Sequence, residues 1–262
     1  MSCKKEKVEN LGPTVQYLHI GRMRGFTNPQ IDPVAANINF DNYDMLWLGG
    51  DLAASSSMDM STMNVLHDVF NLADPNTLWS LGNHDYHDLS LVQQYTLRPT
   101  SYTTHKNGIT FLVLDTQDNY SNIDGSQLAL FNSVMDTISE SSHLVVLHHK
   151  LIWMYDHPVL ESQINAISNG EFGSCFYCLN PNNFYTDLYP RLVDAEQSGI
   201  EVICVGGDIG AFTKTFEYRT LDGIDFLASG LFYLSEENKA LVFTHYLERD
   251  SLVWEYRLTS EL

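Results

Sequence analysis

Short apolar runs that alternate with helical patterns are the feature that most constrains the fold of this chain. Each run has the length and the β-branched or aromatic composition of a buried strand. We expect strands over residues 15–20, 45–48, 77–81, 109–114, 144–147 and 201–205. The segments 61–72, 126–138 and 189–197 place apolar residues at helical spacing, and we expect helices there. Strands that alternate with helices predict an α/β fold.

The pattern changes after Gly210. Four β-type segments follow one another at 212–220, 223–230, 239–249 and 251–258, separated by turn residues such as Leu221-Asp222-Gly223. We expect antiparallel strands here that close the fold. A length of 262 residues suits one large domain, which we assign to residues 14–262, after a flexible tether at residues 1–13.

The segment 152–190 interrupts this regularity. It is rich in aromatic residues, Asn and Gly, it has no steady period, and it directly follows a strand that ends in two histidines. We interpret it as a loop or cap that overhangs a site. A surface excursion packed by its own aromatic side chains is the alternative.

The chain is acidic, with 14 Lys and Arg against 33 Asp and Glu and a net charge of −19. Binding to nucleic acid through its phosphates needs clusters of Lys and Arg, so the composition argues against nucleic acid as a partner, and equally against an anionic membrane surface. Negative charge also disfavours polyanionic polymers as substrates. No stretch approaches the about 18 apolar residues of a membrane-spanning helix.

The cysteines leave two questions open. Ser2-Cys3-Lys4-Lys5 resembles the start of a mature bacterial lipoprotein. Acylation of Cys3 would be the protein's only link to a membrane, on the periplasmic or outer surface; otherwise this is the frayed start of a cytoplasmic protein. Cys175 and Cys178 have redox or zinc spacing but no second pair nearby, so a local disulfide and two free thiols both remain open.

Polar side chains follow four of the expected strands, at the points where the strands end. They are Asp51, Asn83 with His84, His148 with His149, and Asp208. Because ligands gather beyond the carboxyl ends of strands in open α/β sheets, we expect these side chains to converge. Carboxylate, amide and imidazole donors together suit Mn, Fe or Zn. For His149 we expect a supporting or structural role, because successive strand residues point to opposite faces.

These blocks resemble, in their order, the motifs of the calcineurin-like metallophosphoesterase superfamily, from Gly49-Gly50-Asp51 through Gly82-Asn83-His84-Asp85 to the strand-end His and the block at 206–208. The resemblance spans residues 14–262 and implies a four-layer α/β/β/α sandwich that hydrolyses a phosphate ester by a metal-activated water. It further implies that Asp51 bridges two metals, that Asn83 and His148 bind the second metal, and that His84 contacts the phosphate and protonates the leaving group.

The sequence departs from this family in two blocks. The family has Asp-x-His after its first strand, where this chain has Tyr17-Leu18-His19. Either His19 keeps the place of the family's His, or it stands at the place of the Asp with Arg22 near the missing His. The last block has Gly207-Asp208-Ile209-Gly210 instead of Gly-His-x-His. Both departures fall mainly on the first metal.

We therefore expect one or two divalent ions, with Asp51, Asn83, His148, Asp208 and His19 as candidate ligands. Arg22, or Arg24, is a candidate for the missing positive charge, since a guanidinium can bind phosphate bidentately. The sequence predicts a metal-dependent phosphoesterase with Asp51 and His84 as catalytic residues and Arg22, Asn83 and His84 as substrate-binding residues.

Several matters stay open at this stage. A small phosphate ester and one linked to a lipid or a sugar are both possible substrates, and the oligomeric state is not set by the sequence. The alternative function is a degenerate, weakly catalytic or non-catalytic protein of the bacterial envelope that binds a metal or an anion. Asp115 is either a residue behind the site or a helix cap, and Tyr86 and His87 are candidates to line the pocket. We expect structural or surface roles for the remaining histidines, which are His67, His105, His143, His157 and His245.

Overall fold

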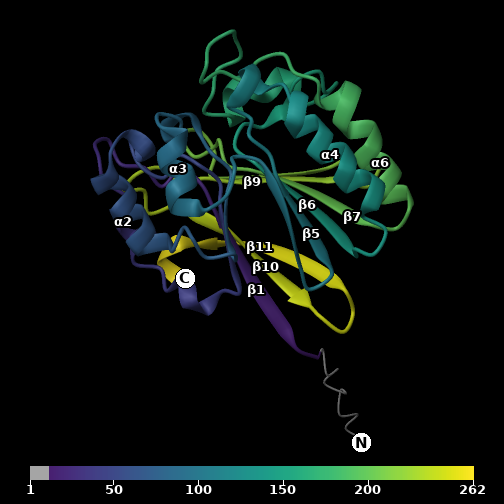
Figure 1. The fold of residues 1–262 in the computed structure, drawn as a ribbon, viewed down its shortest axis with the longest axis horizontal. Helices are drawn as coiled ribbons and strands as arrows, with labels where there is room; N and C mark the ends of the chain where they lie inside the picture. The colour runs from purple at the N-terminus through teal and green to yellow at the C-terminus, as the bar shows by residue number, and fades with distance from the viewer. Residues whose placement is uncertain (1–11) are drawn as a thin grey trace, which may run out of the picture.

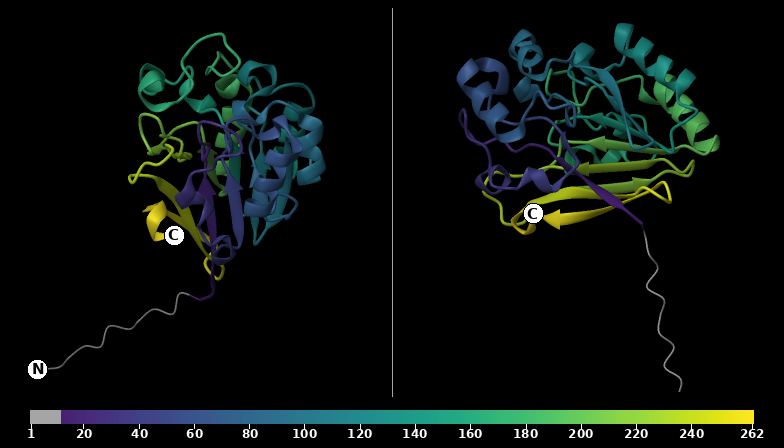
Figure 2. Two further views of the ribbon diagram at one scale, coloured as in Figure 1. Left: turned by 90° about the vertical axis from the view of Figure 1, so that its left-hand side faces the viewer. Right: turned by 60° about the horizontal axis from the view of Figure 1, so that its bottom comes forward.

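Two β-sheets pack face to face in the computed structural model, which describes residues 12–262, and helices cover both outer faces (Figure 1). Figure 2 shows these layers from two further directions. The arrangement is an α/β/β/α sandwich, which confirms the predicted fold class. The predicted tether at 1–13 and the proposed acylation of Cys3 lie largely or wholly outside the described residues, so both stay predictions.

The first sheet has the strand order β11-β10-β1-β2-β3. Its strands are β1 (Thr14–Ile20), β2 (Met45–Leu48), β3 (Thr77–Trp79), β10 (Lys239–Tyr246) and β11 (Ser251–Leu258). β1, β2 and β3 run parallel, whereas β10 is antiparallel to both β1 and β11. The carboxyl ends of β1, β2 and β3 therefore meet at one edge of this sheet.

The second sheet has the order β4-β5-β6-β7-β9-β8. Its strands are β4 (Tyr102–Lys106), β5 (Ile109–Val113), β6 (His143–His148), β7 (Glu201–Gly206), β8 (Thr215–Arg219) and β9 (Asp225–Ser229). β5, β6, β7 and β9 run parallel, and β4 and β8 are antiparallel edge strands. The carboxyl ends of β5, β6 and β7 thus also share one edge.

Helices α2 (Met60–Phe70) and α3 (Leu89–Thr96) cover the first sheet, and α4 (Gly125–Thr137) and α6 (Tyr189–Gln197) cover the second (Figure 1). α1 (Pro33–Ala36) and α5 (Ile164–Ile167) are single turns. Asp59 caps α2 by accepting from the Thr62 amide at 2.8 Å, which satisfies one of the free donors of its first turn. None of the helices in residues 12–262 has the length and apolar character of a membrane-spanning segment.

The apolar core has three parts, one between the sheets and one beneath each helical layer. In β6 the odd-numbered residues Val145 and Leu147 belong to the part between the sheets, and the even-numbered Leu144 and Val146 face the helices. A strand that is buried on both faces reads as a continuous apolar run, which is why the sequence located these strands well.

The C-terminal strands differ from the prediction in one respect. All four segments form strands, and β8 with β9 and β10 with β11 are antiparallel pairs as predicted. The two pairs belong to different sheets, however, and β9 is also parallel to β7. A local pattern of alternating residues indicates a strand without indicating its partner. β4 was not predicted because its sequence, Tyr-Thr-Thr-His-Lys, is polar and half exposed at the edge of the sheet.

The segment 152–190 lies over the helix-covered face of the second sheet. Buried side chains such as Trp153 and Phe184 join it to the core there, and Trp153 stacks on Phe226 of β9. It contains the short helical turns at 152–154, 161–163 and 164–167 and a wider turn at 184–188 that leads into α6. Cys175 and Cys178 form a disulfide within it, so of the two open alternatives the disulfide is the one observed.

Candidate active site

A pocket of about 380 Å³ opens at the edge where the carboxyl ends of the strands meet. It is lined by Arg22, Arg24, Asp51, Asn83, His84, Asn169, Gly170, Tyr177, Asp208, Ala211 and Phe212. Both sheets contribute to this lining, and so does the segment 152–190. Asp51, Asn83, His84, Asp208 and Arg22 are therefore brought together, as the sequence led us to expect.

Two glycines allow the sheets to approach closely at this edge. Gly49 follows β2 and Gly207 follows β7, and a Cβ atom on Gly207 would overlap the carbonyl oxygen of Gly49. Only glycine fits such a contact between two backbones. The close approach places the carboxylate of Asp51, from the first sheet, beside that of Asp208, from the second.

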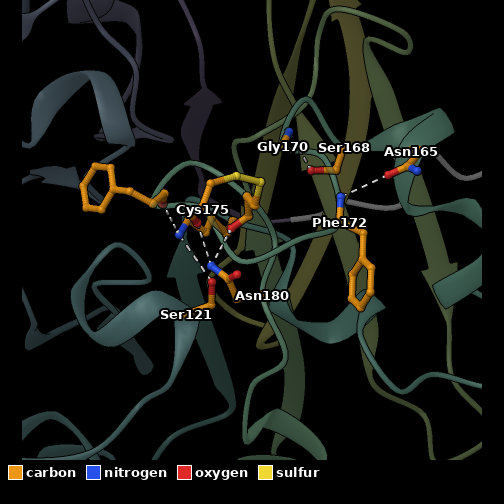
Figure 3. Close-up of a disulfide and its surroundings, with 10 residues drawn as sticks. Ser121, Asn165, Ser168, Gly170, Phe172, Cys175 and Asn180 are labelled. Carbon is orange, nitrogen blue, oxygen red and sulfur yellow. Dashed lines mark hydrogen bonds between the residues drawn. A yellow bond between two sulfur atoms is a disulfide. The ribbon is translucent and has the colours of Figure 1, made fainter.

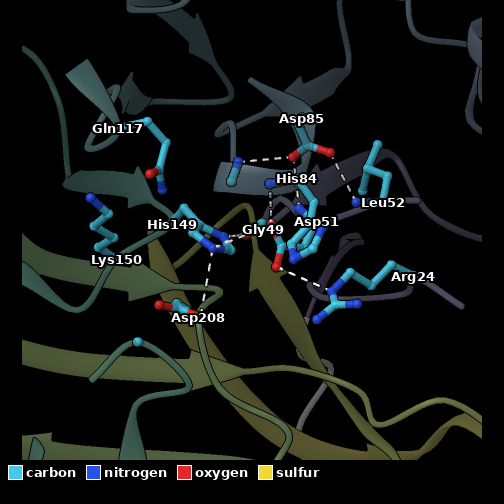
Figure 4. A network of polar contacts seen from close by, with 12 residues as sticks. Arg24, Gly49, Asp51, Leu52, His84, Asp85, Gln117, His149, Lys150 and Asp208 are labelled. Atoms are coloured by element: carbon cyan, nitrogen blue, oxygen red, sulfur yellow. Dashed lines mark hydrogen bonds and ion pairs between the residues drawn. The ribbon is translucent and has the colours of Figure 1, made fainter. Parts of the chain in front are cut away.

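Asp85 fixes the position of Asp51. Its carboxylate accepts hydrogen bonds from the amides of Asp51, Gly82 and Leu52, at 2.7, 2.8 and 3.1 Å (Figure 4). Asp51 itself has a left-handed backbone, with φ of 57°, which costs a non-glycine residue energy unless its surroundings hold it there. Asp85 is thus a positioning residue, to which the sequence analysis gave no role although it lies within Gly82-Asn83-His84-Asp85.

His149 lies between the two carboxylates. Its Nδ1 atom is 2.7 Å from the carbonyl oxygen of Gly49, and its Nε2 atom is 3.6 Å from Oδ1 of Asp51 and 3.6 Å from Oδ1 of Asp208 (Figure 4). Burial by itself lowers the pKa of His149, but Asp51 and Asp208 outweigh that effect and the pKa is raised. His149 is therefore part of the cluster and not only a supporting residue.

His148 occupies a different place from the one that we expected. It is buried, its Nδ1 atom is 2.7 Å from the carbonyl oxygen of Lys150, and its ring packs against Gly206. It is even-numbered like Leu144 and Val146, which face the helices. His149, one residue beyond the end of β6, takes the place beside the carboxylates that the sequence analysis gave to His148.

The pKa values of Asp208 and Asp51 are shifted in opposite directions. Burial raises the pKa of Asp208, with His149 as the largest opposing influence, and the pKa ends above its ordinary value. Burial also raises the pKa of Asp51, but His149, His84 and Arg24 together lower it below the ordinary value. Asp51 is therefore the carboxylate that is held most firmly in its charged form.

His84 and Asn83 lie in a short 3-10 turn (Asn83–Asp85) directly after β3. The backbone amide of His84 donates to Oδ1 of Asp51 at 3.1 Å, and Nδ1 of its ring lies 2.7 Å from the carbonyl oxygen of Ala54. A carbonyl can only accept, so Nδ1 carries a proton and Nε2 is the atom left for a ligand. Both side chains are half buried and line the pocket.

Arg22 and Arg24 supply positive charge on the side of β1. Nε of Arg24 lies 3.6 Å from Oδ2 of Asp51, and the guanidinium of Arg22 donates to the carbonyl oxygen of Leu231 at 3.0 Å. Burial lowers the pKa of Arg22, with Arg24 adding to that effect while Asp51 and Asp208 oppose it. The two guanidiniums make this half of the pocket suitable for an anion.

Among residues 12–262, the positions that the resemblance assigned to the first metal do not converge as a set of ligands. Tyr17 is buried between the sheets, where it stacks on Trp47 and contacts His245. His19 is buried with its Nδ1 atom 2.8 Å from Oγ of Ser229, and it is not among the pocket's lining residues. Gly210 has no side chain that could bind a metal. The positive charge of Arg24, 3.6 Å from Asp51, opposes a second cation beside that carboxylate.

One group of donors has the chemistry of a divalent cation site. Nε2 of His149 is buried without a hydrogen-bond partner in the described residues, and it faces two carboxylates in a pocket that also contains the Asn83 amide. Oxygen and nitrogen donors of this kind suit Mn, Fe or Zn. Within residues 12–262, no three His, Cys, Asp or Glu side chains already converge as ligands, so binding requires these donors to move closer together.

The remaining candidates lie around this centre. Asp115 accepts from the amides of Gln117 and Asp118 at 3.0 and 3.2 Å, so it caps the turn that follows. Tyr86 packs against Phe176 rather than lining the pocket, and His87 is exposed. Among the described residues, the pocket lining includes none of His67, His105, His143, His157 and His245.

Sequence reasoning also missed Lys150, which is buried beside the site (Figure 4). Its Nζ atom donates to the carbonyl oxygen of Phe176 at 2.8 Å and to Oγ of Ser121 at 3.3 Å. Burial lowers its pKa to about 8, with Asp208 and Asp115 opposing. A single Lys after two histidines does not predict a buried ammonium group, because the hydrogen-bond partners of Lys150 come from distant parts of the chain.

No family model and no curated protein matches the sequence. Among solved structures, the fold is similar to that of a dimetal phosphatase from Danio rerio, with a TM-score of 0.59 and 11% identity, over 94% of this chain and 96% of the other.

Two other solved structures are matched over 94% of this chain but only about half of theirs. They are a 5′-nucleotidase precursor from Thermus thermophilus (TM-score 0.49, 12% identity, 54% of its chain) and an NAD nucleotidase from Haemophilus influenzae (TM-score 0.45, 14% identity, 50% of its chain). The sheet order, the strand-end motifs and the likeness to the phosphatase agree, and the chain has the fold of the calcineurin-like metallophosphoesterase superfamily.

Proposed function

We propose that this protein is a phosphoesterase that uses a single divalent cation, with a pair of arginines in place of a second one. The observation that carries the proposal is the position of His149. Its Nε2 atom lies 3.6 Å from the carboxylates of both Asp51 and Asp208 and has no hydrogen-bond partner in the described residues. The fold of the chain, which it shares with a dimetal phosphatase, supports the same class of reaction.

In this proposal Asp51, Asn83, His149 and Asp208 would hold the cation. A divalent cation in such a site supplies Lewis acidity toward water and toward a phosphoryl oxygen. Arg22 and Arg24 bind the phosphoryl group of the substrate through charge-assisted hydrogen bonds. Their two positive charges also offset the negative potential that an acidic protein presents to an anionic substrate.

His84 is the general acid. Because its Nδ1 proton is directed at the carbonyl oxygen of Ala54, the ring can deliver a proton only from Nε2. That atom is the one left to protonate the leaving oxygen of the ester, and a positioned imidazole is the most frequent general acid in enzymes. Asp51, which accepts from the backbone amide of His84, ties the acid to the cation site.

The substrate class is a phosphate ester of limited size, either free or attached to a lipid or a sugar. A net charge of −19 disfavours polyanionic polymers. A second candidate function is binding of an anion without turnover. The observation that favours it is Arg24, whose positive charge lies 3.6 Å from Asp51.

Metal content and turnover separate these functions. We would measure bound Mn and Zn by elemental analysis after loading metal-stripped protein, and hydrolysis of 4-nitrophenyl phosphate by the same samples. We expect one ion per chain and cation-dependent hydrolysis, with both lost in Asp208→Asn and His149→Gln. His148→Gln is the matched control, and we expect it to keep the ion.

Three results would count against the proposal. Two ions per chain would contradict the single-cation site, and an ion that survives in His149→Gln would contradict its ligands. Tight binding of inorganic phosphate without hydrolysis of any ester by the loaded protein would favour the binding function instead.

A further inference from the structure

A short disulfide loop carries an aromatic side chain into the lining of the pocket. Cys175 and Cys178 close the loop around Phe176 and Tyr177. Nδ2 of Asn180 donates to the carbonyl oxygens of Cys175 and Cys178, at 2.8 and 3.2 Å (Figure 3). Tyr177, which the loop contains, lines the pocket.

Contacts with Lys150 and Tyr86 also attach the loop to the rest of the protein. Nζ of Lys150 donates to the carbonyl oxygen of Phe176 at 2.8 Å, and the ring of Phe176 packs against Tyr86 with 5.6 Å between ring centroids. Lys150 is 1% exposed, so this contact connects the loop to the interior beneath the pocket. A segment fixed by a disulfide and a buried ammonium group is preorganised, which lowers the entropic cost of using it to bind a ligand.

Tyr177 is the aromatic residue of this loop that has no ring partner among residues 12–262. Its neighbours are engaged, since Phe176 contacts Tyr86 and Phe172 stacks on Tyr155. Tyr177 is instead 55% exposed. A large ring that is kept in water on a rigid loop at the rim of a pocket is available to a ligand.

Phe212 provides a second ring at the same pocket. It is 66% exposed and lines the pocket together with Tyr177. The amide of the preceding residue, Ala211, donates to the side chain of Asn169 at 2.8 Å, so the strand-end loop that bears Phe212 is tied to the segment that bears Tyr177.

We propose that Tyr177 and Phe212 form an aromatic rim that binds the leaving group of the substrate and selects phosphate esters of flat, aromatic alcohols. The proposal rests on the phosphoesterase function above. Arg22 and Arg24 bind the phosphoryl group of the substrate, and the aromatic rim binds the ring of its leaving group. A volume of about 380 Å³ falls within the range of about 300 to 1,000 Å³ that is typical of small-molecule sites, so there is room for both.

Binding of two phosphonates tests the rim without requiring turnover. Phenylphosphonate and methylphosphonate share the charged group, are not cleaved, and differ only in the ring. We would titrate each into the metal-loaded protein by calorimetry. We expect phenylphosphonate to bind more tightly, and Tyr177→Ala and Phe212→Ala each to weaken it by about threefold to tenfold, the range of an aromatic contact, while methylphosphonate binding stays unchanged.

Two further variants sharpen the result. Tyr177→Phe keeps the ring and should bind phenylphosphonate like the wild type, which separates stacking from any effect of the hydroxyl group. Tyr120→Ala removes a ring that is equally exposed, at 57%, but outside the pocket, and it should change neither affinity. If Tyr177→Ala does not fold, Phe212→Ala and Tyr177→Phe still decide the question.

The outcomes separate the rim from the reaction. Equal affinity for the two phosphonates in the wild type, or equal loss of both in Tyr177→Ala, would overturn the aromatic rim. A preference for phenylphosphonate in a protein that hydrolyses no ester would leave the rim standing and overturn the phosphoesterase function instead.

Discussion

Arg24 should affect cations and anions in opposite directions. Its Nε atom lies 3.6 Å from Oδ2 of Asp51, and the two side chains are 22% and 4% exposed. At an effective dielectric constant of about 20, two unit charges at this distance interact by about 4.6 kcal/mol, which is an upper bound. Water and salt reach Arg24, so we expect its removal to change the energy of a charge beside Asp51 by about 1 to 2 kcal/mol.

The variant that tests this is Arg24→Met, which keeps an unbranched stem and removes the guanidinium and its charge. We expect Mn²⁺ to bind metal-stripped Arg24→Met about five to thirty times more tightly than the wild type, because a competing positive charge has left Asp51. Inorganic phosphate should bind about tenfold more weakly, because a charge-assisted hydrogen bond is lost. Calorimetric titration gives both affinities.

Arg191→Met is the matched control, since Arg191 pairs with Asp136 on the surface, outside the pocket. It should leave both affinities unchanged. Misfolding would weaken both ligands together, so the opposite signs are the decisive feature. If Arg24→Met weakens Mn²⁺, or leaves both ligands unchanged, then Arg24 does not compete with a cation for Asp51 and our account of the pocket is wrong.

Three other predictions concern the acid, the core and the loop. His84→Asn should lower kcat/KM about 10²- to 10⁴-fold for an alkyl phosphate, whose leaving oxygen needs a proton, and much less for 4-nitrophenyl phosphate; equal losses would contradict the acid role. Burial lowers the pKa of His19 to about 3, against 6.5 as a model value. Below pH 6.5, His19 is therefore protonated in the unfolded chain but stays neutral in the folded one. At pH 5 this lowers the free energy of unfolding by about 2 kcal/mol. Urea titrations of His19→Gln should show that much less difference between pH 7.5 and 5, and an unchanged difference would refute the assignment. Replacing Cys175 and Cys178 by Ser should cost at most about 2 kcal/mol, because the closed loop is short, and a larger shift in thermal denaturation would show that the loop supports more of the fold than we infer.

The parallel strands were predictable from the sequence, and their pairing was only partly so. β2 was predicted at its observed bounds, and five other strands to within two residues at each end, because a strand buried on both faces is a continuous apolar run. The pairing of the C-terminal segments depends on contacts between distant parts of the chain, such as β9 with β7. A local pattern contains no information about such contacts.

The candidate site shows the same division. Asp51, Asn83, His84 and Asp208 could be located because strand ends meet at one edge. The choice between His148 and His149 could not, because a run buried on both faces does not show which face meets the first sheet. The observed packing of Val145 and Leu147 between the sheets decides it. The roles of Lys150 and Tyr177 depend on a loop whose course the sequence did not predict.

The close contact between the two sheets at Gly49 and Gly207 has a consequence for stability. Asp51 follows a strand of the first sheet, whereas His149 and Asp208 follow strands of the second. A cation bound by all three would crosslink the two halves of the sandwich, at the edge where Gly49 and Gly207 touch. Because such a ligand binds only the assembled sandwich, a hundredfold excess over Kd should raise the free energy of unfolding by about 2.7 kcal/mol. Without the cation, the two sheets would separate at this edge at a lower temperature on heating. The cation would therefore stabilise the fold as well as take part in the reaction.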